Sequence, residues 1–411
     1  MTVRRNVTPP AAAALILTAL LAVSCAPDRN TDARPAAGDA SATPHGYVEG
    51  AREAAEQQSR LLLNDPGTGD TRVLDLITGK THRTDPVKGA DRLETDGRFG
   101  FLSTPDSTHV LDGGSWMVDH GDHIHYYSAA VRDVGRLPTD TAAQVRSDAA
   151  VSAATGTNGR VSLLDRAKLE KGALPSPRTL PGAYTGVAVP HEEHLLAFTD
   201  EGGTGRLVVL DREGQRVAEP RATCRTPRGD AVTRRGVVIG CADGALLVRA
   251  EGGSFTAEEI PYGRDVPEEE RATAFRHRPG SDTLTAPAGD RAVWVLDVTD
   301  KTWKRVETGP VVAANTAGEG SPLLVLESDG ALHGYDIATG EPTRRTRPLL
   351  TGGGRTADGG SAPVIEVDRS RAYVNDPDGK RVFEIDYNDG LRTARTFDLD
   401  AKPVLMAETG R

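Results

Sequence analysis

The sequence lacks the features that mark several large classes of protein. Lysine and arginine number 49 against 59 aspartates and glutamates, a net charge of −10, so there is no positive excess with which to bind nucleic acid. Neither a Gly-x-Ser-x-Gly elbow nor a glycine-rich phosphate loop occurs, which removes the linear motifs of serine hydrolases and P-loop enzymes. We therefore predict a protein that is not an enzyme, although site residues scattered along a chain can form an active site without such a motif.

Long apolar runs are also scarce, and the one near the N-terminus is short. Residues 11–23 are apolar and follow Arg4 and Arg5. This run is too short to span a bilayer and is typical of a secretory signal peptide, which we predict at residues 1–24. Residues 21–25 resemble a bacterial lipobox, in which a lipid is attached to the cysteine, here Cys25. We thus expect an exported protein anchored by lipid on the outer face of the cytoplasmic membrane; the alternative is a plain signal peptide with an incidental cysteine.

Cysteine is rare, with three residues in the whole chain. With Cys25 set aside, Cys224 and Cys241 remain, and in an exported protein a disulfide is the default for such a pair. It would close a loop of about 17 residues and stabilise the fold by roughly 3 kcal/mol on the chain-entropy model. A thiolate metal pair is the less favoured alternative, because the spacing is wide and no third sulfur exists.

What the chain does have is a repeat. An apolar strand, a turn and a second strand that usually ends in aspartate recur with a mean period of about 44 residues, the second strands ending at Asp75, Asp112, Asp165, Asp211, Val248, Asp297, Asp336 and Asp386. A period in the forties with several strands per unit is typical of β-propeller blades. We predict an all-β fold, an eight-bladed β-propeller over residues 45–411, preceded by a flexible tether at residues 25–44. Seven blades would result if the unit ending at Asp165 were an elaborated loop.

The two ends of the repeat complement each other. A shorter strand-like segment, expected to be the innermost strand, precedes every unit except the first, at residues 60–84. The tail has one such segment to spare, at residues 402–407. We therefore predict that the C-terminal strand completes the first blade and closes the ring, which removes an exposed sheet edge. Residues 47–58, with several alanines, are predicted to form a short helix before the first strand.

Histidines are concentrated at one place. Three of the ten, His120, His123 and His125, lie within six residues, with Asp119 and Asp122 among them. In a strand, the side chains of His123 and His125 point to the same side, and the Gly-Asp pair before His123 can turn the chain to bring His120 back. Converging imidazoles with a carboxylate close by suit a zinc ion. The alternative is a polar surface turn that has no metal function.

The other histidines have simpler explanations. His191 and His194 flank a Glu-Glu turn, which indicates an exposed hairpin. His277 is at the end of a predicted inner strand, where a lone histidine is more often a hydrogen-bonded filler of the channel than a metal ligand.

Four stretches resemble AztD, a family of extracytoplasmic zinc metallochaperones. They are residues 45–60, residues 111–127 (Leu-Asp-Gly-Gly-Ser-Trp-Met-Val-Asp-His-Gly-Asp-His-Ile-His-Tyr-Tyr), Cys224 with residues 241–247, and residues 371–377. The second stretch is the most specific. The resemblance runs along the whole mature chain and implies a β-propeller that binds zinc and passes it to the solute-binding protein of a zinc ABC transporter.

The chain departs from the family pattern in the predicted channel. The family has further histidines on inner strands, and at two such positions this chain has Gln144 and Arg228. A guanidinium cannot ligate zinc and would repel it. The resemblance therefore implies zinc binding through His120, His123 and His125 beside an altered channel. Two other functions stay open: a metal-free, lipid-anchored scaffold that binds a partner, and a channel enzyme such as a lactonase or a cofactor-dependent dehydrogenase.

Overall fold

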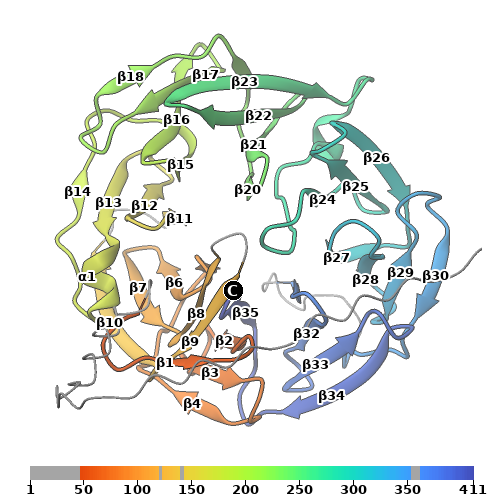
Figure 1. Cartoon of the computed structure of the whole chain (residues 1–411). Helices are drawn as coiled ribbons and strands as arrows, with labels where there is room; N and C mark the ends of the chain where they lie inside the picture. Colours follow the sequence, from red (N-terminus) through yellow and green to blue (C-terminus); the bar gives the residue numbers. More distant parts are fainter. Residues whose placement is uncertain (1–46, 120–122, 139–142, 353–361) are drawn as a thin grey trace, which may run out of the picture. The chain divides into compact units, whose positions relative to one another are not determined.

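The computed structural model of the chain describes residues 47–119, 123–138, 143–352 and 362–411. The predicted signal peptide and tether, Cys25 and His120 lie outside the described residues. His45–Arg411 forms one compact unit, and within it the described strands make nine antiparallel sheets. Eight of these sheets follow one another around a ring, each with one edge toward the centre (Figure 1). The predicted all-β propeller with eight blades is confirmed, and the unit ending at Asp165 is a full blade.

The first four blades each have four strands, which run in order from the inner to the outer edge. They are β35 (Leu405–Thr409), β2 (Arg60–Asn64), β3 (Thr71–Asp75) and β4 (Thr81–Arg83); β5 (Arg92–Thr95), β6 (Phe99–Thr104), β7 (Ser107–Asp112) and β10 (Arg132–Pro138); β11 (Ala143–Ser147), β12 (Val151–Gly156), β13 (Val161–Asp165) and β14 (Arg178–Thr179); and β15 (Thr185–His191), β16 (His194–Glu201), β17 (Thr204–Leu210) and β18 (Arg216–Ala218). A short strand, β19 (Thr223–Arg225), also pairs with β17.

The last four blades repeat this order. They are β20 (Asp230–Thr233), β21 (Gly236–Cys241), β22 (Gly244–Glu251) and β23 (Ser254–Pro261); β24 (Thr283–Pro287), β25 (Ala292–Asp297) and β26 (Thr302–Glu307); β27 (Val311–Thr316), β28 (Leu323–Glu327), β29 (Leu332–Tyr335) and β30 (Pro342–Arg345); and β31 (Ile365–Val367), β32 (Ala372–Asp376), β33 (Arg381–Asp386) and β34 (Arg392–Asp398). In the sixth blade a single bridge from Arg276 to Thr285 stands in the place of the inner strand.

Burial explains the composition of each strand position. The second strand of the seventh blade, β28, reads Leu-Leu-Val-Leu-Glu and is buried throughout, because blades pack face to face and cover both sides of their central strands. Such strands read as continuous apolar runs. The outermost strand, β30, reads Pro-Thr-Arg-Arg and is exposed throughout. The core therefore lies between neighbouring blades.

The aspartates that end the repeat fix the turns that follow them. The side chain of Asp75 accepts a hydrogen bond from the backbone N–H of Thr78 at 2.8 Å, and that of Asp297 accepts one from Thr299 at the same distance. Asp side chains stabilise turns in this way. At these positions the repeated aspartate thus has a structural role in the turn.

The C-terminal strand completes the first blade, as predicted. β35 pairs with β2 over five residues, from Arg60 with Thr409 to Asn64 with Leu405. The chain therefore ends on an inner strand, near the centre of the ring in Figure 1.

The predicted helix at residues 47–58 is wrong. The segment contains a three-residue strand, β1 (Arg52–Ala54), which pairs with β9 (Ile124–Ser128). Alanine has the highest helix propensity, but propensity is a weak determinant, and here pairing with the edge of β9 overrides it. Within the described residues the helices are short, α1 (Arg166–Glu170) and a 3₁₀ turn at Glu268–Glu270. Among these residues no helix is both long enough and apolar enough to cross a membrane.

The predicted disulfide is present between Cys224 and Cys241, whose Cα atoms are 5.2 Å apart. Cys224 lies on β19, which pairs with the fourth blade, and Cys241 ends β21 of the fifth blade. The bond therefore links two neighbouring blades. Disulfides of this kind are typical of proteins in oxidising compartments.

Candidate metal centre

The histidine cluster lies on a hairpin that is inserted into the second blade. β8 (Ser115–Asp119) and β9 leave the blade after β7 and return to it at β10, and with β1 they form a separate three-stranded sheet. The base of the hairpin is rigid. Trp116 and Tyr127 face each other in the register with stacked rings, their centroids 5.5 Å apart. The guanidinium of Arg98, which is buried and paired with Asp112, lies 3.7 Å from the centre of the Trp116 ring.

Two histidine nitrogens converge near the tip of the hairpin. The Nε2 atom of His123 is 3.1 Å from the Nε2 atom of His125. Two ligands of one tetrahedral zinc ion, each about 2.0 Å from the metal, are separated by roughly 3.3 Å. Both side chains point to the same side, as the strand alternation predicted. The two imidazoles are therefore spaced to share one ion.

A carboxylate fixes the orientation of His125. The Nδ1 atom of His125 is 2.6 Å from Oε1 of Glu53 on β1. A ligating imidazole typically donates one ring N–H to a carboxylate, which sets the tautomer and makes the other nitrogen a better ligand. In this arrangement Nδ1 carries the proton and the lone pair of Nε2 can bind metal. Sequence reasoning missed Glu53, since it is 72 positions away from His125 and lies in the segment predicted as helix.

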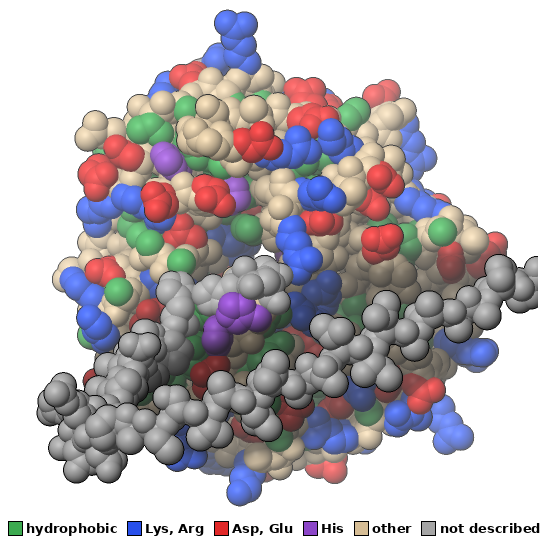
Figure 2. Space-filling model, viewed as in Figure 1, with side chains coloured by type: hydrophobic (Ala, Val, Ile, Leu, Met, Phe, Trp, Pro, Cys, Tyr) green, Lys and Arg blue, Asp and Glu red, His purple; other side chains and the backbone are tan. Residues whose placement is uncertain are grey.

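The site is open to solvent. The His123 side chain is exposed, and the His125 side chain retains 24 % of its accessible surface. On the face drawn in Figure 2, histidine side chains are visible at the surface where the hairpin lies in Figure 1. Asp119, at the end of β8, is also exposed. An exposed set of nitrogen and oxygen ligands allows a bound ion to exchange one ligand at a time.

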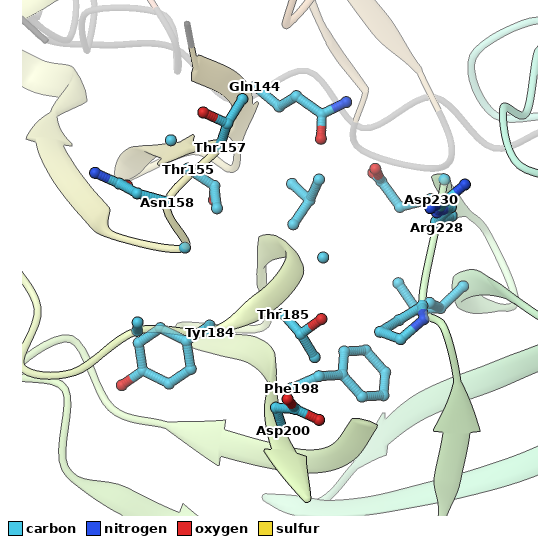
Figure 3. Close-up of a pocket in the computed structure, with 18 of the residues that line it drawn as sticks. Gln144, Thr155, Thr157, Asn158, Tyr184, Thr185, Phe198, Asp200, Arg228 and Asp230 are labelled. Carbon is cyan, nitrogen blue, oxygen red and sulfur yellow. The ribbon is translucent and has the colours of Figure 1, made fainter. Parts of the chain in front are cut away.

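The two departures from the family pattern line a single cavity. Gln144 of β11 and Arg228, which follows β19, both line a cavity of about 850 Å³ (Figure 3). The remaining polar side chains of its wall include Thr155, Asn158 and Asp200. None of the described residues that line this cavity is a histidine. A cation site of imidazoles is therefore not formed there by the described side chains.

The charges along the channel largely neutralise one another. Arg146 of β11 binds Asp230 through Nε at 2.6 Å and Glu94 through Nη1 at 2.8 Å. Arg411, at the end of the chain, binds Glu366 at 3.0 Å. Carboxylates that are held by guanidinium groups are poor metal ligands, because the metal would have to displace a paired charge.

His191, His194 and His277 behave as predicted. His191 and His194 pair across the β15–β16 hairpin, whose turn residues have positive φ. The Nε2 atom of His277 lies 3.2 Å from the carbonyl oxygen of Val232; because a carbonyl only accepts, Nε2 carries the proton. Burial lowers the pKa of His277 to about 4. His277 is thus a neutral, hydrogen-bonded filler of the channel.

Comparison with solved structures supports the fold. No protein-family model matches the sequence. The crystal structure of Citrobacter koseri AztD is similar with a TM-score of 0.73 at 19 % identity, and covers 86 % of this chain and 98 % of that one. The apo structure of the same protein gives 0.72 at 17 % identity with the same coverage. A more distant likeness is to the dihydro-heme d1 dehydrogenase NirN, with a TM-score of 0.55 at 14 % identity over 87 % of this chain and 77 % of NirN. The chain thus has the β-propeller fold of AztD.

Proposed function

We propose that this is an extracytoplasmic protein that binds zinc at the β8–β9 hairpin and delivers it to the solute-binding component of an ABC transporter. The observation that carries the proposal is the 3.1 Å separation of the His123 and His125 Nε2 atoms, with Glu53 held on the opposite nitrogen of His125. His120, which falls between the two strands in the sequence, is the third proposed ligand. Zinc is cargo in this proposal, and the protein performs no chemistry on it.

The position of the hairpin suits transfer. A protein that hands on zinc needs ligands that an acceptor can replace in steps, and a closed site of four thiolates would not allow this. The hairpin offers imidazoles at the surface on a base held by Trp116, Tyr127 and Arg98. The net charge of −10 also favours the approach of cations. Cys25 is the proposed lipid attachment site that keeps the protein close to the transporter.

Zinc titration against a competing chelator tests the proposal. The hairpin of the full chain is expected to bind one equivalent of zinc with submicromolar affinity, and a variant with His120, His123 and His125 all changed to alanine is expected to lose that equivalent. His82→Ala, which removes an exposed histidine on β4, is the matched control and should bind as the unchanged protein does. Transfer is then measured by mixing the zinc-loaded chain with a zinc-free solute-binding protein.

The alternative is a metal-free propeller that acts as a lipid-anchored scaffold. The cavity lined by Gln144 and Arg228 favours it, because this wall offers amide, hydroxyl and guanidinium groups and no histidine among the described residues that line it. Under this alternative, zinc binding is weak and the triple alanine variant binds zinc as the unchanged chain does.

A further inference from the structure

A second group of metal-ligating side chains lies in the seventh blade, at the turn that joins β28 to β29. Glu327 ends β28, and its carbonyl accepts a hydrogen bond from the N–H of Gly330 at 2.9 Å, which closes the turn. His333 pairs with Val325, two residues before Glu327. Because paired residues and residues two apart share a face of the sheet, the side chains of Glu327 and His333 lie on the same side. Asp329, within the turn, completes the group.

The ligand atoms of this turn cluster, Glu327, Asp329 and His333, are close together. The Nε2 atom of His333 is 3.0 Å from Oδ2 of Asp329 and 3.6 Å from Oε2 of Glu327. One ligand atom from each residue lies within 4.8 Å of the other two. These separations bracket the roughly 3.3 Å expected between ligands of a tetrahedral ion.

Neighbouring groups orient each carboxylate through one oxygen, and the other oxygen of each faces the Nε2 atom of His333. Oε1 of Glu327 accepts hydrogen bonds from the Tyr335 hydroxyl and, at 3.1 Å, from the N–H of Gly309. Oδ1 of Asp329 accepts one from the N–H of Ala331 at 2.9 Å. Burial and the bond to Glu327 raise the pKa of Tyr335 to about 12, so that its hydroxyl stays a donor.

Glu327 is the unusual member of the cluster. It is only 6 % exposed, and its Oε2 atom faces the Nε2 atom of His333 at 3.6 Å. A β-carbon at position 309 would lie 1.8 Å from this oxygen, so the orientation of the carboxylate depends on a glycine there. A buried carboxylate is costly unless a cation or hydrogen-bond donors compensate its charge.

We propose that Glu327, Asp329 and His333 bind a second divalent transition-metal ion, with zinc as the matching one. Two carboxylates and one imidazole neutralise a charge of +2, and the mixed nitrogen and oxygen set favours zinc over calcium, which prefers oxygen ligands. Asp329 retains 45 % of its side-chain surface, which gives the ion access and a water the fourth position. This site is independent of the histidine hairpin and goes beyond the proposed function.

The test uses the full chain in which His120, His123 and His125 are changed to alanine, so that only the turn cluster is left to bind. We expect this chain to retain one equivalent of zinc, and to give the visible absorption of tetrahedral cobalt when Co²⁺ is used in its place. Adding Asp329→Asn should weaken binding by more than about 100-fold, since removal of a direct ligand exceeds the 10–100-fold loss typical of outer partners. Asn preserves the bond from Ala331, and the exposed position keeps the fold intact.

Two further variants keep the result interpretable. His333→Ala in the same background should also abolish binding, and His82→Ala, an exposed histidine of another blade, should leave it unchanged. Circular dichroism and thermal unfolding verify that each variant folds. The proposal is overturned if the triple alanine chain binds no zinc, or if it binds zinc equally well with and without Asp329 and His333. The cluster is then only an ion pair between a histidinium and two carboxylates. In a chain that keeps His120, His123 and His125, His333→Ala should still lower zinc binding, even if the hairpin itself binds no zinc.

Discussion

The inserted hairpin and the channel wall are both rich in polar side chains, yet they use them in opposite ways. In the channel, Arg146 joins Asp230 and Glu94 in ion pairs that neutralise much of the charge. On the hairpin, the carboxylate of Glu53 is held on Nδ1 of His125, and Nε2 is directed toward His123. Polar groups that satisfy one another stabilise a fold, whereas ligand atoms oriented toward a common point are arranged for an ion. The difference predicts which substitutions change stability and which change zinc binding.

The largest effect is expected from Arg146→Ala. It leaves the buried carboxylate of Asp230 without its partner, and breaking such a pair costs about 3–5 kcal/mol of unfolding free energy. Urea denaturation measures the loss, and zinc binding at the hairpin should be unchanged in the folded protein. Arg225→Ala removes an exposed ion pair with Asp243 and is the control, with little effect expected. If the two variants were equally stable, the ion pairs of Arg146 in the channel would not stabilise the fold, and our interpretation of the channel would be wrong.

Replacement of both cysteines comes next. Cys224→Ser with Cys241→Ser removes the link between the fourth and fifth blades, beside the cavity that holds Arg228. For a sequence separation of 17 residues, the loss of unfolding free energy is expected to be about 3 kcal/mol. Denaturation of the chain with and without a reductant gives the same comparison without mutation. The hairpin is on another blade, so zinc affinity should not change when stability falls. A loss of zinc affinity together with stability would contradict the independence of the hairpin from the channel.

Glu53→Ala is expected to lower zinc affinity and to leave stability nearly unchanged, which is the reverse of the two preceding changes. Without this carboxylate, the tautomer and the basicity of His125 are no longer fixed, and zinc affinity should fall by about 10–100-fold. Stability should change little, because the Glu53 side chain is half-exposed. Glu56→Ala removes the same charge from the same exposed segment and is the matched control. Equal affinity of the two variants would show that Glu53 acts only through its charge, or not at all.

The smallest effect concerns His277 and pH. Its pKa is lowered from 6.5 to about 4 in the folded protein, so between these values the unfolded chain binds the extra proton and the folded chain does not. The contribution of His277 to the free energy of unfolding is therefore fully present above pH 6.5 and is lost as the pH drops toward 4. Since His277 is only half-buried, the fall attributable to it should be roughly 1 kcal/mol. His277→Gln should flatten this part of the stability profile measured by denaturation between pH 4 and 7.

The sequence predicted the fold well because its signals are local and repeated. The blades repeat similar apolar strands, most of them followed by a turn aspartate, and the spare strand at the C-terminus was visible as an unmatched unit. His123 and His125 were equally clear, because two residues on one side of a strand need no long-range information. Glu53 was not, since its role depends on a three-residue strand that joins the hairpin only in the folded protein.

The turn cluster in the seventh blade was missed for a different reason. Its segment, Glu-Ser-Asp-Gly-Ala-Leu-His, reads as an ordinary hairpin turn between two apolar strands. The site depends on the burial of Glu327 and on the contacts of Tyr335 and Gly309, which hold that carboxylate. Gly309 lies outside the hairpin, and its closeness to Glu327 arises from the packing of the blade. No spacing rule in one sequence reveals it.

The pairing of the last strand with the first blade also constrains how the protein can be made and handled. Because β35 fills the inner position beside β2, two strands that are far apart in the sequence must meet to complete this blade. Until then β2 has an open edge, and contacts separated by nearly the whole chain make such folding slow and prone to misassociation. Arg411 is paired with Glu366 at the end of that strand, so an affinity tag placed after it would start inside the channel. Purification handles are therefore better placed elsewhere on the chain.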